Sequence, residues 1–351
     1  MGNLQAPFPW FGGKSRVADL VWSRFGSVDN YVEPFAGSLA VLLGRPKAGM
    51  IETVNDLDGL LANFWRSVKL SPQETAQWAD QPVNENDLHA RHVWLIKRLP
   101  TLSAQLEGDP DYHDPKVAGW WVWGLCCWIG GGWCRGDGPW WPNADGLLVK
   151  GNAGKGVKRK LPLLGNAGTG VNRQLPHLGD AGRGVNRQLP HLGSAGQGVN
   201  RQADIYGWFA ALSERLARVR VASGDWTRVC GPSVTWNNAG NRGDSAVTGV
   251  FLDPPYADTA DRAGNLYRTD CLSVAHDVRK WAIDNGKNPQ MRIALCGYEG
   301  EHVMPDDWEC VAWKANGGYG GQDKDGDNDN ARRERVWFSP YCLSGAQGKL
   351  L

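Results

Sequence analysis

The chain has 351 residues, of which 42% are hydrophobic and 21% charged, so it can bury one large core with an insertion or two modest domains. A formal net charge of only +1 excludes a basic field over the whole surface, so any nucleic-acid contact must rely on locally concentrated basic residues. The eight cysteines lack zinc-knuckle or disulfide-scaffold spacing, and no apolar segment is long enough for a membrane span or an export signal. We therefore expect a cytoplasmic, monomeric protein with reduced thiols, no metal and no membrane contact.

Strands and helices alternate in the first 70 residues, as in a doubly wound sheet. A helix is predicted up to Phe25, a short strand at 31–32 and a second strand at 50–54. The apolar residues from Leu57 to Val68 recur at intervals of three and four, which predicts a further helix.

The same alternation returns in the last third of the chain. Apolar residues on one face predict a helix from Ile205 to Val219, and short apolar runs predict strands at 219–222, 248–252, 291–296 and 335–339. Together with the first 70 residues, they predict an α/β fold with a Rossmann-like sheet of about seven strands.

Residues 71–203 interrupt this alternation and are predicted to be a long insertion between two parts of one core, 1–70 and 204–351. The insertion contains a segment with seven tryptophans at 120–141 and a tandem repeat of period 14 at 151–202. Three glycines and a proline in each full repeat exclude a continuous helix there.

The predicted strand at 248–252 ends in Asp253-Pro254-Pro255-Tyr256. An amine on a purine ring becomes nucleophilic when its lone pair leaves conjugation, and a carboxylate and a backbone carbonyl that accept from the amine favour that state. Asp253 and the carbonyl of Pro254 fit these roles, and the two prolines stiffen the turn. Tyr256 offers a face on which a base swung out of a duplex can stack. The alternative is an ordinary proline-stiffened turn.

A second group of residues forms the turn from Glu33 to Ser38, between a strand and an apolar helix. Nucleotide-like cofactors bind at the carboxyl ends of parallel strands, and Gly37 permits close approach of the backbone. Asp56 directly follows the next strand, where a carboxylate can accept from both ribose hydroxyls, whereas Asp58 already lies at the helix start. Capping of that helix is an alternative role for Asp56 and is compatible with ligand binding.

The order and spacing of these motifs resemble those of the Dam-like (alpha-class, D12) DNA adenine-N6 methyltransferases, with matches at Pro9 to Lys14, Val32 to Ser38, Asn55-Asp56 and Asp253 to Tyr256. The resemblance covers residues 7–70 and about 219–342. It implies an S-adenosylmethionine-dependent methyltransferase sheet, DNA as the partner, and transfer of a methyl group to adenine N6, with base flipping.

The resemblance also implies a cofactor site, whose residues are Trp10, Lys14, Glu33, Phe35, Gly37, Asp56 and Asp225. Trp10 and Lys14 would lie near the methionine part of S-adenosylmethionine, and Phe35 and Gly37 would line its pocket. Asp56 would hold the ribose.

Two further positions bear on the same site. Asp225, in the segment Gly224-Asp225-Trp226, would accept from the amine of the cofactor's adenine. Leu39 departs from the family pattern, in which a small residue is usual after the Gly-Ser turn, and it bears on the shape of the pocket.

The target-recognition region of this class lies between its two conserved halves, where residues 71–203 fall. Within 151–201, eight Lys and Arg stand against one Asp, which suits phosphate contact, and the repeated Asn-Arg-Gln triplets suit base edges. A flexible surface insertion without a target is the alternative.

The tryptophans of 120–141 predict a compact apolar subdomain, and the alternative is that one or two of them wedge into the base stack. The acidic run from Asp323 to Glu334 superficially suggests a calcium loop. Because Asn328 stands where such a loop needs glycine, we expect a solvated loop instead.

Methylation of cytosine N4 or of adenine in RNA is the alternative within enzymes. At the position of Asp253 to Tyr256, the cytosine N4 enzymes tend to have Ser-Pro-Pro-Tyr and the RNA adenine enzymes Asn-Pro-Pro-Tyr. Asp253 therefore argues against both. An alternative of another class is a repeat-bearing DNA-binding protein whose methyltransferase core is only a scaffold, and the intact motifs argue against it.

Overall fold

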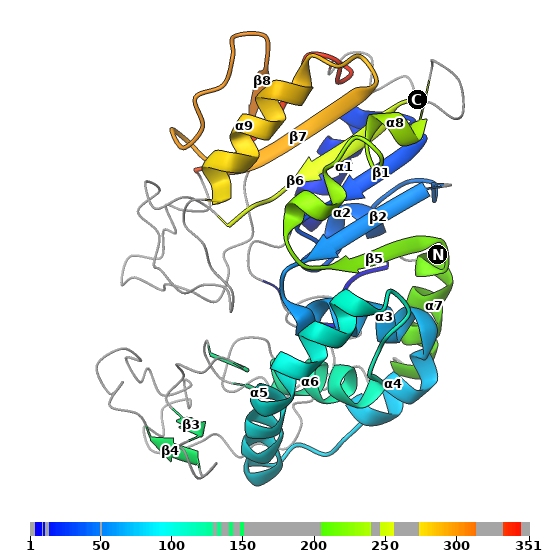
Figure 1. The fold of residues 1–351 in the computed structure, drawn as a ribbon, viewed down its shortest axis with the longest axis vertical. Coiled ribbons are helices and arrows are strands. Elements are labelled where there is room, and N and C mark those ends of the chain that lie inside the picture. Colours follow the sequence, from blue (N-terminus) through cyan, green and yellow to red (C-terminus); the bar gives the residue numbers. More distant parts are fainter. Residues whose placement is uncertain are drawn as a thin grey trace, which may run out of the picture. The chain divides into compact units, whose positions relative to one another are not determined.

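The computed structural model describes residues 4–8, 10, 14–49, 51–128, 132–134, 140–142, 148–150, 205–239, 246–255, 274–313 and 333–344. The chain forms two compact units: a sheet unit (residues 1–5, 10–58 and 218–351) and a helical unit (residues 6–9 and 59–217). Figure 1 labels the elements of both units. The predicted repeats at 151–202, the acidic run before Arg333, and Tyr256 lie outside the described residues.

The sheet unit contains a seven-stranded sheet with the spatial order β5-β2-β1-β6-β7-β9-β8. Neighbouring strands are parallel except at β9, which runs antiparallel to both β7 and β8. The strands are β1 (Asn30–Glu33), β2 (Ile51–Asp56), β5 (Val219–Ser223), β6 (Thr248–Leu252), β7 (Met291–Tyr298), β8 (Glu309–Ala312) and β9 (Glu334–Phe338). The mixed α/β fold with a seven-stranded sheet is therefore confirmed.

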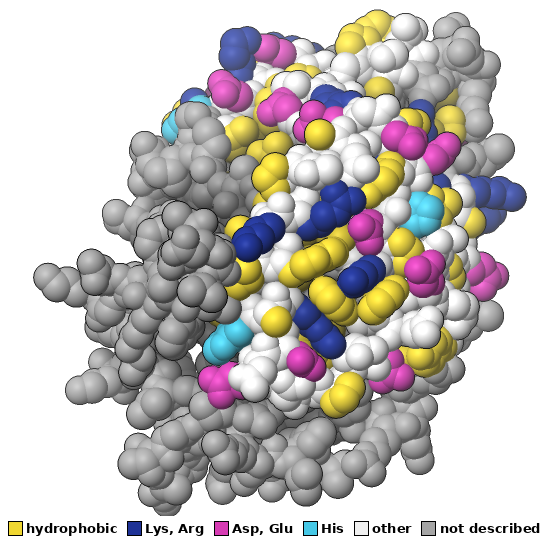
Figure 2. All heavy atoms as spheres, turned by 60° about the horizontal axis from the view of Figure 1, so that its bottom comes forward, with side chains coloured by type: hydrophobic (Ala, Val, Ile, Leu, Met, Phe, Trp, Pro, Cys, Tyr) yellow, Lys and Arg dark blue, Asp and Glu magenta, His cyan; other side chains and the backbone are white. Residues whose placement is uncertain are grey.

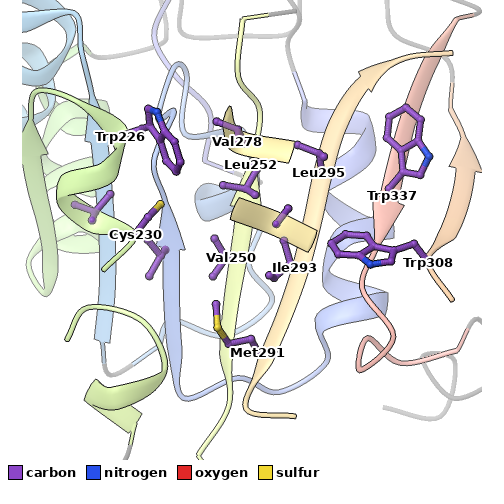
Figure 3. Close-up of a cluster of buried hydrophobic side chains, with 13 residues drawn as sticks. Trp226, Cys230, Val250, Leu252, Val278, Met291, Ile293, Leu295, Trp308 and Trp337 are labelled. Atoms are coloured by element: carbon purple, nitrogen blue, oxygen red, sulfur yellow. The ribbon is translucent and has the colours of Figure 1, made fainter. Parts of the chain in front are cut away.

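Both faces of this sheet are covered, as a mostly parallel sheet requires. On one face, Val250 and Leu252 of β6 join a buried cluster that includes Val278 of α9 (Val274–Gly286), shown in Figure 3. On the other face, Gly249 admits Phe25 of α1 (Ser15–Phe25), because a Cβ at this glycine would lie 2.9 Å from the phenyl ring. All five residues of β6 are buried, as expected for a strand in the middle of such a sheet.

The sheet reverses its order of growth between β1 and β6. β2 and β5 lie on one side of β1, and β6 and the later strands lie on the other. Ligands of open α/β sheets bind at such a switch point, outside the carboxyl ends of the strands. Glu33, Asp56 and Asp253 stand at the carboxyl ends of β1, β2 and β6, so the topology brings these three predicted site residues to one edge.

The turn after β1 enters α2 (Ala40–Leu43) through Leu39, whose φ of 54° and ψ of 26° lie in the left-handed region. This backbone conformation costs a non-glycine residue about 1–2 kcal/mol. The Leu39 side chain is fully buried, so packing offsets that strain. The sheet unit also contains a 3₁₀ helix (Trp226–Val229) and the short helix α8 (Trp236–Ala239).

The helical unit consists of five helices and a two-stranded hairpin within its described residues: α3 (Gly59–Leu70), α4 (Pro72–Ala79), α5 (Glu85–Gly108), α6 (Pro115–Cys127), α7 (Ile205–Leu216), β3 (Trp140–Pro142) and β4 (Leu148–Lys150). α3 lies in its centre, and Arg66 of α3 donates to the carbonyls of Leu106, Asp109 and Tyr112 at 3.0–3.3 Å. The units divide at 58/59 and 217/218, so α3 and α7 pack with the helical unit. The division into a catalytic core and a target-recognition insertion at 71–203 stays a prediction.

The tryptophan-rich segment has both buried and accessible members. Trp121, Trp123 and Trp133 are buried, as a compact apolar subdomain requires. Trp120 is only partly buried, and the Lys116 ammonium lies 4.5 Å from its ring centroid. On the face shown in Figure 2, Lys and Arg side chains lie among hydrophobic ones. Wedging into a base stack stays a hypothesis for the partly buried tryptophans.

Candidate active site

The edge at the ends of β1 and β2 is fixed by one buried asparagine. Asn55 Nδ2 donates to the carbonyl of Pro34 at 3.1 Å and to the carbonyl of Gly224 at 2.9 Å. The carbonyl of Asn55 in turn accepts from Ala36 N at 2.8 Å. Asn55 thus ties the turn after β1 to the segment after β5. The Asn55-Asp56 motif included Asn55 without a role, and the available signal was its position beside Asp56 at the end of β2.

Asp56 holds the same turn with its side chain. Its Oδ2 accepts from Gly37 N at 3.1 Å, and its Oδ1 accepts from Asp58 N at 2.8 Å. The carboxylate is half-buried. It therefore orders two backbone segments, and each carboxylate oxygen has lone pairs for further donors.

Gly37 is required by its surroundings. Its φ is 46°, and a Cβ on it would lie 2.7 Å from Nε1 of Trp10. The indole of Trp10 therefore packs directly on the turn, as the cofactor-site prediction places both residues in one pocket.

Replacing Gly37 with alanine is expected to lower the free energy of unfolding by about 1–3 kcal/mol, because the left-handed backbone disfavours a Cβ and Trp10 must move. Chemical denaturation measures this change. Gly231→Ala is the matched control, since a Cβ at Gly231 would meet no atom within 4 Å. Equal losses in the two variants would show that Gly37 is not under this constraint.

Asp253 lies beside a buried cation. Lys14, which directly precedes α1, places its Nζ 3.2 Å from Asp253 Oδ1. Burial raises the pKa of Asp253 to about 6, Lys14 opposes that rise, and the negative charges of Glu334 and Glu301 add to it. The carboxylate is therefore a stronger proton and hydrogen-bond acceptor than an exposed aspartate.

Glu33 is almost completely buried at the end of β1. Burial raises its pKa to about 8, and the negative charges of Asp253 and Glu52 contribute, while a hydrogen bond of 2.9 Å from the hydroxyl of Tyr31 opposes the rise. Glu33 and Asp253 thus share one electrostatic environment at the ends of the neighbouring strands β1 and β6.

Because folding raises the pKa of Glu33 from 4.5 to about 8, the protonated form favours the folded state, and this contribution is lost progressively between these two pH values and is gone above about pH 8. We expect the free energy of unfolding to fall between about pH 6.5 and pH 8, by at most about 1.4 kcal/mol per pH unit for this group. Glu33→Gln should flatten the decrease. Denaturant titrations of both proteins across this range test it, and an equal slope in both would contradict it.

Asp225 and Phe35 both belong to the predicted cofactor site, but they differ in their contacts. Asp225 Oδ1 accepts from Thr227 N at 3.0 Å and from the Thr227 hydroxyl, so it caps the 3₁₀ helix. Phe35 stacks on Trp226, with ring centroids 6.3 Å apart. Asp225 is exposed, which leaves it accessible to a ligand.

The remaining part of the motif at β6 is only partly described. Pro254 is buried and Pro255 half-buried, whereas Tyr256 lies outside the described residues. The described geometry therefore brings together Trp10, Lys14, Glu33, Phe35, Gly37, Asp56, Asp225 and Asp253 in one compact unit.

Residues 10–106 match the family model of the D12 class N6 adenine-specific DNA methyltransferases. Over these residues the chain is similar to this class. The comparison with curated protein sequences gives no match. The matched segment contains the turn from Glu33 to Gly37 and Asp56, and the seven-stranded sheet is consistent with a methyltransferase fold.

This match supports methylation of adenine N6 in DNA, and enzymes of this class in general use S-adenosylmethionine. Within the described ranges, no helix has the length and apolar character needed to cross a membrane. No group of His, Cys, Asp and Glu in those ranges could hold a metal ion.

Proposed function

We propose that the edge formed by β1, β2 and β6 binds S-adenosylmethionine beside a target adenine, and that the enzyme methylates adenines at specific DNA sites. The observation that carries this proposal is the pairing of β1 with β6, which puts Asp253 next to the turn from Glu33 to Gly37. A strand order that separated these residues would have left no shared site.

The residues present suit this cofactor. Asn55 Oδ1 is buried and, within the described residues, has no hydrogen-bond partner, so it is available to a donor. The carboxylates of Asp253 and Glu334 both lie beside the ammonium of Lys14 and outnumber it, and a locally negative site favours a sulfonium. When bound, S-adenosylmethionine supplies a sulfonium methyl group that passes to the adenine amine and leaves the thioether S-adenosylhomocysteine.

The cofactor's parts are assigned to residues as follows. Trp10 and Lys14 border the methionine part, Glu33, Phe35 and Gly37 form the pocket wall, and Asp56 accepts from the ribose hydroxyls. Asp225 accepts from the adenine amine of the cofactor. Hydrogen bonds to a charged carboxylate are strong enough for these aspartates to contribute to affinity.

Asp253 and the carbonyl of Pro254 would accept hydrogen bonds from the target amine, and the amine, once methylated, would give up one proton to the Asp253 carboxylate. Since the pKa of Asp253 is raised to about 6, its carboxylate stabilises the positive charge that develops on the amine better than an exposed aspartate would. Tyr256 stacks on the flipped base.

The test is incubation of the protein with methyl-labelled S-adenosylmethionine and DNA, followed by digestion and separation of the nucleosides. Label in N6-methyladenine supports the proposal. Label in N4-methylcytosine, or label only with RNA, would reassign the substrate. DNA binding without any transfer would show an inactive scaffold, and mapping of the modified adenines would give the recognised site.

A further inference from the structure

Lys14 is held between two carboxylates that come from different strands. Its Nζ lies 3.2 Å from Asp253 Oδ1 and 3.7 Å from Glu334 Oε2, and the side chains of Lys14 and Glu334 are 7% and 6% exposed. Both distances exceed the roughly 2.7–2.9 Å of a close charge-assisted hydrogen bond. The ammonium is therefore shared and is not committed to Asp253.

Glu334 is fixed in this position by the sheet. It begins β9, stands opposite Tyr298 of β7 in the antiparallel register, and its carbonyl accepts from Trp313 N at 3.2 Å. The Trp313 ring also faces the cation, with Lys14 Nζ 5.2 Å from its centroid. Lys14 is fixed in turn because its carbonyl accepts the first backbone bonds of α1.

We propose that Glu334 is a positioning residue for methyl transfer: by sharing the Lys14 ammonium, it prevents a tight ion pair between Lys14 and Asp253 and leaves the Asp253 carboxylate able to accept from the target amine. This inference rests on the proposed function of Asp253. A cation that fully neutralised Asp253 would compete with the amine for the same oxygens.

Several ionisable groups around Asp253 affect the pH at which its carboxylate takes up a proton. Lys14 precedes α1 and favours the charged carboxylate, whereas the acidic groups disfavour it. The groups from the packed elements that interact with Asp253 are Glu33 of β1, Cys296 of β7, Glu301 after β7, and Glu334 of β9. Tyr298 of β7 interacts instead with Lys14 and Glu334. Cys296 and Tyr298 have raised pKa values because of burial, so they are neutral near neutral pH.

The test compares wild type with Glu334→Gln, a neutral side chain of equal size, in single-turnover methyl transfer from about pH 5 to about pH 9. Without the Glu334 carboxylate, Lys14 pairs more closely with Asp253. The acid limb of the pH–rate profile, which reports the ionisation of Asp253, should move to lower pH by about half a unit or more. The plateau rate should fall by about 3- to 10-fold. Cofactor affinity should stay within about twofold, because the change acts on the acceptor.

A merely structural role of Glu334 predicts the opposite sign. If its loss only disordered Lys14, Asp253 would lose its cation, and the acid limb would move up. An upward or unchanged limb therefore overturns the inference. Glu299→Gln is the matched control at the neighbouring end of β7, since Glu299 is 64% exposed and pairs with Arg335 at 2.8 Å, and its profile should match wild type.

Should Glu334→Gln fail to fold, Glu334→Asp provides the second test, because the shorter side chain keeps the charge but withdraws it from Lys14. A smaller downward shift supports the inference, and no shift or an upward one overturns it. Wild type and the Glu334 variants together distinguish a failure of the proposed function from a failure of the role given to Glu334. A wild type without methyl transfer refutes the proposed function, whereas an active wild type with an unmoved limb in the variants refutes only the role of Glu334.

Discussion

Asp253→Ala is expected to lower the single-turnover rate of methyl transfer by at least about 100-fold, the scale typical for loss of one preorganised group that stabilises transition-state charge. The side chain serves the acceptor amine, so the affinity for S-adenosylmethionine should stay within about threefold. Rapid-quench measurement of labelled DNA and calorimetric titration of the cofactor give the two quantities.

The control for this variant is Asp307→Ala, an exposed aspartate of the same unit that lies outside the site. It should leave rate and affinity unchanged. A comparable loss of cofactor affinity in Asp253→Ala would assign Asp253 to the cofactor and would contradict the role given to it here. Removal of Asp253 also takes one of its two carboxylate partners away from Lys14, so the folded state of the variant is to be verified by its thermal unfolding.

Asp56→Ala is expected to weaken cofactor binding by about 10- to 100-fold, which corresponds to the roughly 1.5–3 kcal/mol of a hydrogen bond to a charged group. Two effects add: the ribose loses its acceptor, and Gly37 N loses the carboxylate oxygen that holds it at 3.1 Å. At saturating cofactor, the transfer rate should fall much less than the affinity.

Asp58→Ala provides the comparison, because it keeps the backbone N–H that donates to Asp56 Oδ1 at 2.8 Å and removes only the neighbouring carboxylate. Its cofactor affinity should stay close to wild type. If Asp56→Ala also binds the cofactor as wild type does, Asp56 only orders the backbone, which is the capping role left open by the sequence.

Elements with regular apolar patterns could be predicted from the sequence. The strands β5, β6, β7 and β9 lie within a few residues of their expected positions, and α3 follows the spacing of its apolar residues. β8 was missed because most of its side chains are exposed and it lacks an apolar run. α5 continues through Pro100, because packing within the helical unit outweighs one missing backbone donor.

Within the proposed site, the sequence predicted roles for the groups at strand ends, and these roles stay predictions. It missed the structural role of Asn55, whose partners Pro34 and Gly224 are 21 and 169 residues away. It also attached no chemistry to Glu334, which meets Lys14 only because β9 folds back beside β7. Such partners follow from strand order, which local spacing does not encode.

The sequence by itself determined the chemical groups of the proposed site: Asp-Pro-Pro-Tyr, the turn around Gly37 and the carboxylate of Asp56. Only the tertiary structure decided how they act on one another, because burial and long-range pairing set their charges. The sheet removes Glu33 and Asp253 from water, which raises the pKa of each, and places a single cation between Asp253 and Glu334. These electrostatic effects depend on distances in space, and the three chain segments that create them are far apart in sequence.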